Sequence, residues 1–289
     1  MKLIIPLVIA VTAVFFLNRF DVQIVSRNEQ IVSEAVSLDA SALQEVVVPE
    51  SGYTVPLQWG DVGQKLLAIG AVDLDKYQNI YTDPEQLAYI TQSMDKEITI
   101  NRANAYFWVN TLWGLGLTQK SDVLTNGVMG TEYKADLANF ASTAGWTLGG
   151  KDALELYSSQ EIVVLTQEQQ DMVSKIANGI YRPCCGNPTS FPDCNHGMAI
   201  LGLIELMVSQ GFSESEIYRA ALAFNSYWFE QTYIDLAYYF QKEKNTVWEN
   251  IDPKLVLSAE YSSAPGYQTI KEQIGAIPGS SKGGASCGA

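Results

Sequence analysis

Apolar residues recur at helical spacing along most of the chain, and a clear example is the segment "NRANAYFWVNTLWGLGL". Its apolar positions lie three or four residues apart, the spacing that lines one face of an α-helix: Ala105, Trp108, Val109, Leu112 and Trp113. Glycines follow at positions 114 and 116. Because glycine is a poor helix former, the sequence predicts that this helix ends there.

Capping residues mark the starts of two further helices. Asp83 is followed by Pro84, a pair typical of an N-cap and the first helical position. Thr166 and Gln169 have the spacing of a capping box. The helix that they begin is expected to end at Gly179.

Two long helical patterns occupy the C-terminal third of the chain. "HGMAILGLIELMVSQG" is apolar on nearly every side, so a central buried helix that ends at Gly211 is expected. "SESEIYRAALAFNSYWFEQTYIDLAYYFQKEK" begins with a capping box, Ser213 and Glu216, and predicts one helix of about thirty residues. We interpret its many aromatic residues as core and helix-packing surface.

Strand patterns are few and short. They lie near residues 45 ("EVVVP"), 98 ("ITI") and 161 ("EIVVLT"). Helical patterns dominate and no linker divides residues 57–274, so the sequence predicts a mainly α-helical fold with a single helical domain over that range. We expect a tether over residues 21–56 and a flexible glycine-rich tail over residues 275–289.

The N-terminal segment carries an unbroken apolar run from Leu3 to Leu17, flanked by Lys2 and Arg19. A helix over this run would be about 22 Å long, between a signal-peptide core and a minimal membrane span. No small-residue cleavage site follows the run directly. We therefore expect residues 1–20 to be an uncleaved membrane anchor, with the body extracytoplasmic, in the cell envelope. Cleavage of a signal peptide and secretion is the alternative.

Composition and charge narrow the classes of function. Hydrophobic residues make up 47% of the chain and charged residues 17%, which indicates a folded protein rather than a disordered one. The net charge is −14 and Lys and Arg form no cluster, which disfavours binding to nucleic acid. His196 is the only histidine, which excludes a two-histidine zinc protease.

Three of the chain's four cysteines and its single histidine lie within one turn-rich loop, residues 181–197. They have the spacing Cys-Cys-x8-Cys-x-His: Cys184, Cys185, Cys194 and His196. Thiolate and imidazole are the ligands that soft and borderline cations prefer, so the loop predicts a transition-metal site. Zinc or copper is the expected ion, and an iron–sulfur cluster stays open as an alternative.

Three further expectations concern this predicted site. Side chains of adjacent cysteines diverge, so we expect only one of the pair to bind a single ion, or both to serve a cluster. Asn195 or Asp193 is expected to cap a helix that begins near His196 and favours the thiolate form of nearby cysteines. Cys287, in the flexible tail, is a candidate accessory ligand because the tail is long enough to reach the loop.

Together these features predict a membrane-anchored, extracytoplasmic metal-binding protein with a role in binding, sensing or trafficking. Two alternatives stay open. Cys184 or Cys185 could form a disulfide with Cys194, giving an interaction domain without metal whose aromatic helices dock a partner protein. The other alternative is an iron–sulfur or thiol redox protein. The sequence does not decide whether the protein is an enzyme.

Three carboxylates lie within otherwise apolar helical patterns: Glu205, Glu230 and Asp235. A buried charge is costly unless it is paired. We therefore interpret each as reaching a partner, such as Arg182 or Arg219, or water at a helix edge.

Overall fold

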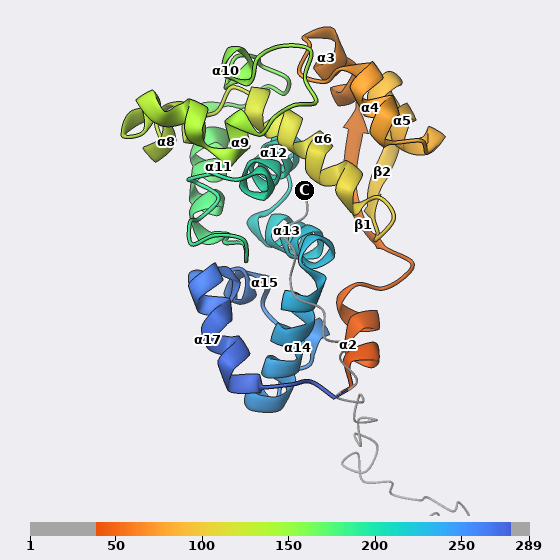
Figure 1. Ribbon diagram of the computed structural model, residues 1–289, viewed down its shortest axis with the longest axis vertical. Coiled ribbons are helices and arrows are strands. Elements are labelled where there is room, and N and C mark those ends of the chain that lie inside the picture. The colour runs from red at the N-terminus through yellow and green to blue at the C-terminus, as the bar shows by residue number, and fades with distance from the viewer. Residues whose placement is uncertain (1–38, 279–289) are drawn as a thin grey trace, which may run out of the picture. The chain divides into compact units, whose positions relative to one another are not determined.

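The computed structural model describes residues 39–278, which belong to one compact unit. This part of the chain is mainly helical, with one small antiparallel sheet, so the predicted fold class is confirmed (Figure 1). The predicted anchor, residues 1–20, and Cys287 lie outside the described residues.

The first elements include both strands of the sheet. They are α2 (Ala40–Val47), β1 (Tyr53–Gly60), α3 (Val62–Ala68), α4 (Leu74–Ile80), α5 (Pro84–Thr91) and β2 (Met94–Ile100). Part of the predicted tether is therefore folded, and Val47, Val48 and Val55 within it are buried. The strand predicted near residue 45 is wrong. The Asp39 side chain accepts a hydrogen bond from the Ala42 N–H at 2.9 Å and so caps a helix there.

The sheet pairs β1 with β2, which confirms the strand predicted near residue 98. Tyr53 lies opposite Ile100, and Val55 lies opposite Ile98. Val55, Leu57 and Trp59 alternate with exposed residues, as expected of a strand with one buried face. The predicted boundary between tether and domain, residues 56 and 57, falls inside this strand.

The segment "EIVVLT" is not a strand. The Gln119 side chain accepts hydrogen bonds from the N–H groups of Ile162 and Val163, at 2.9 Å each, and this fixes the segment as irregular backbone. Only Gln160 just before it forms an isolated bridge, with Gln119. A side chain therefore replaces the strand partner that the apolar pattern suggested.

The middle of the chain contributes one long helix and several short ones. They are α6 (Ala105–Thr118), α7 (Asp122–Thr125), α8 (Val128–Thr131), η1 (Lys134–Asn139), α9 (Ala141–Ala144) and α10 (Ala153–Leu156). The glycines of α6 do not end it, so that prediction is wrong. A Cβ atom at Gly116 would lie 2.1 Å from the Met198 carbonyl oxygen. Glycine is required inside the helix because a second helix backbone passes directly against it.

That second helix is α12 (Asn195–Ser209), and it lies beside α6 in the centre of the described unit (Figure 1). Nearly all its residues are buried, which confirms the predicted central helix. At the same crossing, a Cβ atom at Gly202 would lie 2.5 Å from the Leu112 carbonyl oxygen. The preceding helix, α11 (Gln167–Gly179), begins with the predicted capping box of Thr166 and Gln169.

The C-terminal elements are α13 (Glu214–Trp228), α14 (Glu230–Lys244), η2 (Trp248–Asn250), α15 (Pro253–Val256), α16 (Ala259–Ser262) and α17 (Ala264–Ile274). The Ser213 capping box is confirmed, but the single thirty-residue helix is wrong because the chain leaves helical geometry at Phe229 (φ −130°, ψ 49°). The break lets α13 pack against α6 and α12 while α14 packs against α2 and α17.

The three intrahelical carboxylates differ in their surroundings. Glu230 pairs with Arg102 at 3.0 Å, and Asp235 pairs with Lys271 at 2.5 Å. Both are therefore paired, although neither uses the arginines that the sequence suggested. Glu205 is completely buried in α12, and neither of its carboxylate oxygens has a hydrogen-bond partner.

Glu205 should make stability depend on pH. Burial raises its pKa well above 4.5, and the nearby Ser121 hydroxyl offsets this only in part. A raised pKa in the folded state means that stability is fully present below the pKa of the unfolded chain and is lost as pH rises toward the folded pKa. Glu205→Gln removes this loss, so at pH 7 it should raise the free energy of unfolding by about 1–3 kcal/mol.

Urea unfolding of both proteins between pH 4 and pH 8 measures this effect. The difference between Glu205→Gln and the unmodified chain should be small near pH 4 and should widen as pH rises. The exposed Glu243→Gln serves as a matched control and should change stability by less than about 0.5 kcal/mol at every pH. A constant difference across the range would contradict the assignment.

Candidate metal centre

The loop between α11 and α12 is folded back by its own backbone. The Thr189 N–H donates to the Ile180 carbonyl at 2.8 Å, and the Ser190 N–H donates to the Ala177 carbonyl at 3.1 Å. The start of α17 also contacts the loop, because the Ala264 N–H donates to the Cys185 carbonyl at 2.8 Å. These contacts place the first two cysteines of the loop opposite its end, as the turn residues predicted.

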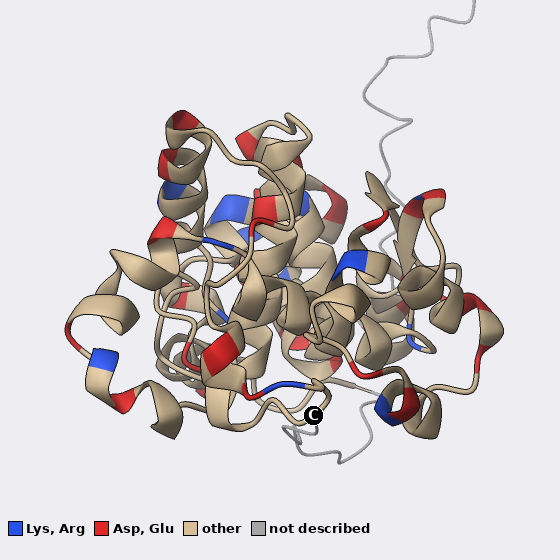
Figure 2. Cartoon of the chain, turned by 90° about the horizontal axis from the view of Figure 1, so that it is seen from above, with Lys and Arg blue, Asp and Glu red and all other residues tan. Residues whose placement is uncertain are grey.

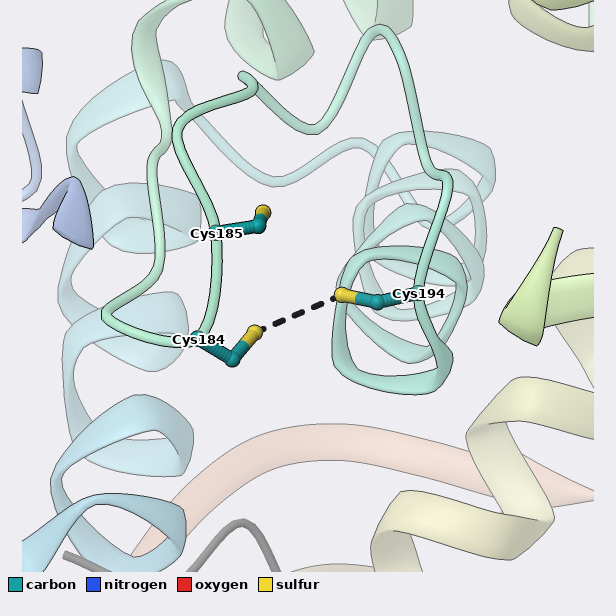
Figure 3. A group of neighbouring side chains, drawn as sticks. All are labelled: Cys184, Cys185 and Cys194. Carbon is teal, nitrogen blue, oxygen red and sulfur yellow. Dashed lines mark hydrogen bonds between the residues drawn. The ribbon is translucent and has the colours of Figure 1, made fainter.

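The three cysteines of the loop form a cluster. The Sγ atoms of Cys184, Cys185 and Cys194 all lie within 4.8 Å of one another, and all three are free thiols (Figure 3). The sulfurs of Cys184 and Cys194 are 3.4 Å apart. Four-coordinate zinc with bonds of about 2.3 Å places its sulfur ligands about 3.8 Å apart, so this spacing suits one metal ion. Contrary to the expected divergence, both adjacent cysteines belong to the cluster.

Cys194 is the N-cap of α12. Its sulfur accepts a hydrogen bond from the Gly197 N–H at 3.4 Å. The sequence predicted Asn195 or Asp193 as the cap, and that prediction is wrong because Asn195 is already the first residue of the helix and the Asp193 side chain is engaged elsewhere. The predicted proximity of a thiol to a helix N-terminus is nevertheless present.

Arg182 is the buried centre of the loop. Its side chain is completely buried, and its Nε–H donates to the Cys194 sulfur at 3.1 Å. The other nitrogens donate to the Asn187 carbonyl at 2.9 Å and to Asp193 Oδ1 at 2.7 Å. A second backbone acceptor is the Phe191 carbonyl, at 3.3 Å. One guanidinium therefore ties the two cysteine-bearing ends of the loop together.

Gly197 makes room for this arginine. A Cβ atom at position 197 would lie 2.4 Å from Arg182 Cζ, so the guanidinium lies flat against the first turn of α12 only because that residue is glycine. The sequence pattern did not identify Arg182 or Gly197 as site residues. The signal that was available is a lone arginine two positions before a cysteine pair, in a chain with few basic residues.

Contacts within the cluster separate the pKa values of the three thiols. The pKa of Cys194 lies well below its ordinary value, because the Cys184 and Cys185 thiols donate to its sulfur and Arg182 stabilises its charge. Contacts with Cys185 and with Cys194, together with burial, raise the pKa of Cys184. The contact with Cys184 lowers the pKa of Cys185, but its contact with Cys194 and burial outweigh this and raise it to about 11. One thiolate, on Cys194, is therefore stabilised before any metal binds.

His196 lies outside the cluster. Its ring packs against the rings of Trp228 and Phe229, with centroids 5.6 Å and 4.5 Å away. Burial lowers its pKa to about 4, opposed by the negative charge of Cys194, and its Nδ1 atom has no hydrogen-bond partner. The group of mutually close ligand atoms does not include this residue, so its role as a ligand stays a prediction.

Comparison of the chain with family models, curated proteins and solved structures finds no match. Among the helices between residues 39 and 278, none combines the length and apolar character needed to cross a membrane.

Proposed function

We propose that this protein binds a single transition-metal ion through the thiols of Cys184, Cys185 and Cys194. The observation that carries the proposal is that their three sulfurs lie within 4.8 Å of one another in a loop that is already folded. A site that is organised before the metal arrives does not spend binding free energy on ordering the chain. The buried charge of Arg182 offsets part of the negative charge that three thiolates bring together.

The donor set favours a soft ion. Thiolates select copper(I), zinc and iron–sulfur clusters over hard cations such as magnesium. Copper(I) accepts three thiolates in a plane, whereas zinc and a cluster require a fourth ligand. We propose Cys287 as that accessory ligand. The sequence places it in the glycine-rich tail, within reach of the loop.

We further propose that residues 1–20 anchor the protein in a membrane and that the folded body lies outside the cytoplasm. The apolar run from Leu3 to Leu17 supports this proposal. The net charge of −14 would draw cations toward the protein, and acidic residues are spread over many of the described helices and loops (Figure 2). The role would then be binding, sensing or trafficking of the ion.

Metal titration of the full chain, purified and kept without oxygen, tests the proposal. We expect one equivalent of copper(I) or zinc to bind, with three thiols protected from alkylation. Cys194→Ser should weaken binding by at least the roughly 10–100-fold that loss of an outer-shell partner costs, because it removes a ligand outright. Dialysis against competing chelators of known affinity measures the change.

Two further variants complete that titration, one as a control and one as a test of the accessory ligand. Ser190→Ala changes a residue of the same loop that offers no soft ligand, and it should leave affinity within about twofold. Cys287→Ser should weaken zinc more than copper(I) if the tail supplies a fourth ligand. Full affinity in Cys194→Ser, or no bound metal in the unmodified chain, would overturn the proposed function.

A further inference from the structure

Cys184 and Cys194 are placed for bond formation with each other. Their sulfurs are 3.4 Å apart, and a disulfide bond of about 2.05 Å requires an approach of about 1.4 Å. Cys184 lies in a loop without regular secondary structure, so a small shift of its side chain and backbone can supply that approach. Both residues are partly exposed.

Cys185 is the member of the cluster that such a bond would leave out. Its sulfur lies 3.8 Å from the Asn187 carbonyl oxygen, and Figure 3 shows its side chain apart from the line that joins the other two sulfurs. A bond between Cys184 and Cys185 is disfavoured, because adjacent Cα atoms lie about 3.8 Å apart and disulfides need about 4.4–6.8 Å. The geometry therefore selects one pair from the three.

Cys194 is the better nucleophile of this pair. Its sulfur receives hydrogen bonds from Arg182 Nε–H at 3.1 Å and from the Gly197 N–H at 3.4 Å. Both donors hold negative charge on this sulfur, at the start of a helix and beside a guanidinium. No comparable donor to Cys184 is present among the described residues; its sulfur contacts Cys194.

We propose that Cys184 and Cys194 form a reversible dithiol–disulfide couple that exchanges with small-molecule disulfides of the glutathione type. Cys194 loses its proton to solvent, attacks one sulfur of the small disulfide and displaces one thiolate, which leaves a mixed disulfide on Cys194. Cys184 then loses its proton and attacks the Cys194 sulfur, which displaces the second thiolate. The protein loses two electrons and two protons, and the small disulfide becomes two thiols.

Oxidation of this pair also controls the metal site, and this part of the inference rests on the proposed function. The disulfide removes two of the three sulfur ligands of the loop, so the site should lose most of its affinity for the ion. The loop itself survives, because Arg182 keeps its bonds to Asp193 and to two backbone carbonyls. Bound metal should in turn protect the pair, because a coordinated sulfur is a poorer nucleophile.

Incubation of the reduced, metal-free full chain with oxidised glutathione tests the couple. We expect two glutathione thiols released per protein and, after alkylation and peptide mapping by mass spectrometry, a bond between Cys184 and Cys194 with Cys185 alkylated. Cys184→Ser should stop at a glutathione adduct on Cys194. Cys185→Ser is the matched control and should still form the disulfide. Zinc-loaded protein should react at least tenfold more slowly.

The outcomes separate this inference from the proposed function. A bond from Cys185 or Cys287 to Cys194, or no bond at all, overturns the couple, while metal binding can still stand. Formation of the Cys184–Cys194 bond in a chain that binds no metal supports the couple and overturns the proposed function. Equal rates with and without bound zinc would overturn the link between the two.

Discussion

Replacing Arg182 by methionine is expected to lower the free energy of unfolding by about 3–5 kcal/mol, the range found when one partner of a buried ion pair is removed. Methionine keeps an unbranched apolar stem but no donor. The change leaves Asp193 without its cation and the Asn187 carbonyl without its arginine donor. It also removes the donor to the Cys194 sulfur, so metal affinity should fall together with stability.

Urea denaturation of the metal-free protein measures the first effect, and metal titration measures the second. Arg182→Lys tests geometry separately from charge, because lysine cannot form the bonds of a planar guanidinium to several acceptors. It should recover only part of the stability. Arg219→Met, at an exposed position, is the matched control and should change stability by less than about 0.5 kcal/mol. A loss below about 1 kcal/mol in Arg182→Met would show that the loop does not depend on this residue.

Gly116→Ala is expected to destabilise the protein by about 3 kcal/mol or more, at the upper end of what overpacking costs. The new Cβ would lie 2.1 Å from the Met198 carbonyl oxygen, and backbone atoms of a buried helix cannot turn aside as a side chain can. The helices α6 and α12 must therefore separate. Because Met198 lies one turn from Cys194, the displacement should also weaken metal binding.

Gly114→Ala is the matched control in the same helix. Both substitutions gain the roughly 1 kcal/mol of helix propensity that alanine has over glycine. The nearest neighbour of a Cβ atom at position 114 is the Trp146 side chain, at 3.0 Å, rather than a backbone. Gly114→Ala should therefore stay within about 1 kcal/mol of the unmodified chain. Equal losses in the two variants would show that the helix crossing does not set the cost.

The local features of the fold could be predicted from the sequence because their causes lie within a few residues. The capping boxes at Thr166 and Ser213 form as predicted, since each joins residues three positions apart. The elements that were mispredicted have distant causes. Gly116 lies inside α6, where it makes room for the backbone of α12 instead of ending the helix. The break at Phe229 lets α13 and α14 pack against different helices.

The same distinction between local and distant causes applies to the candidate site. The cysteine content of the loop and its turn residues are enough to indicate a cysteine cluster. The sequence did not show that the sulfurs of Cys184 and Cys194 lie 3.4 Å apart or that the His196 ring packs against Phe229. It also did not show that Arg182 holds the loop together, because its acceptors are scattered over residues 187–194.

The sequence by itself determined the helical class, several helix starts and the segment that carries the soft ligands, because apolar spacing, caps and turn residues act over short range. Only the tertiary structure decided which helices cross at glycines, which charges are buried without a partner, and which sulfurs meet. Those outcomes depend on distances between residues that are far apart in the chain, and such distances are fixed only when the whole core packs.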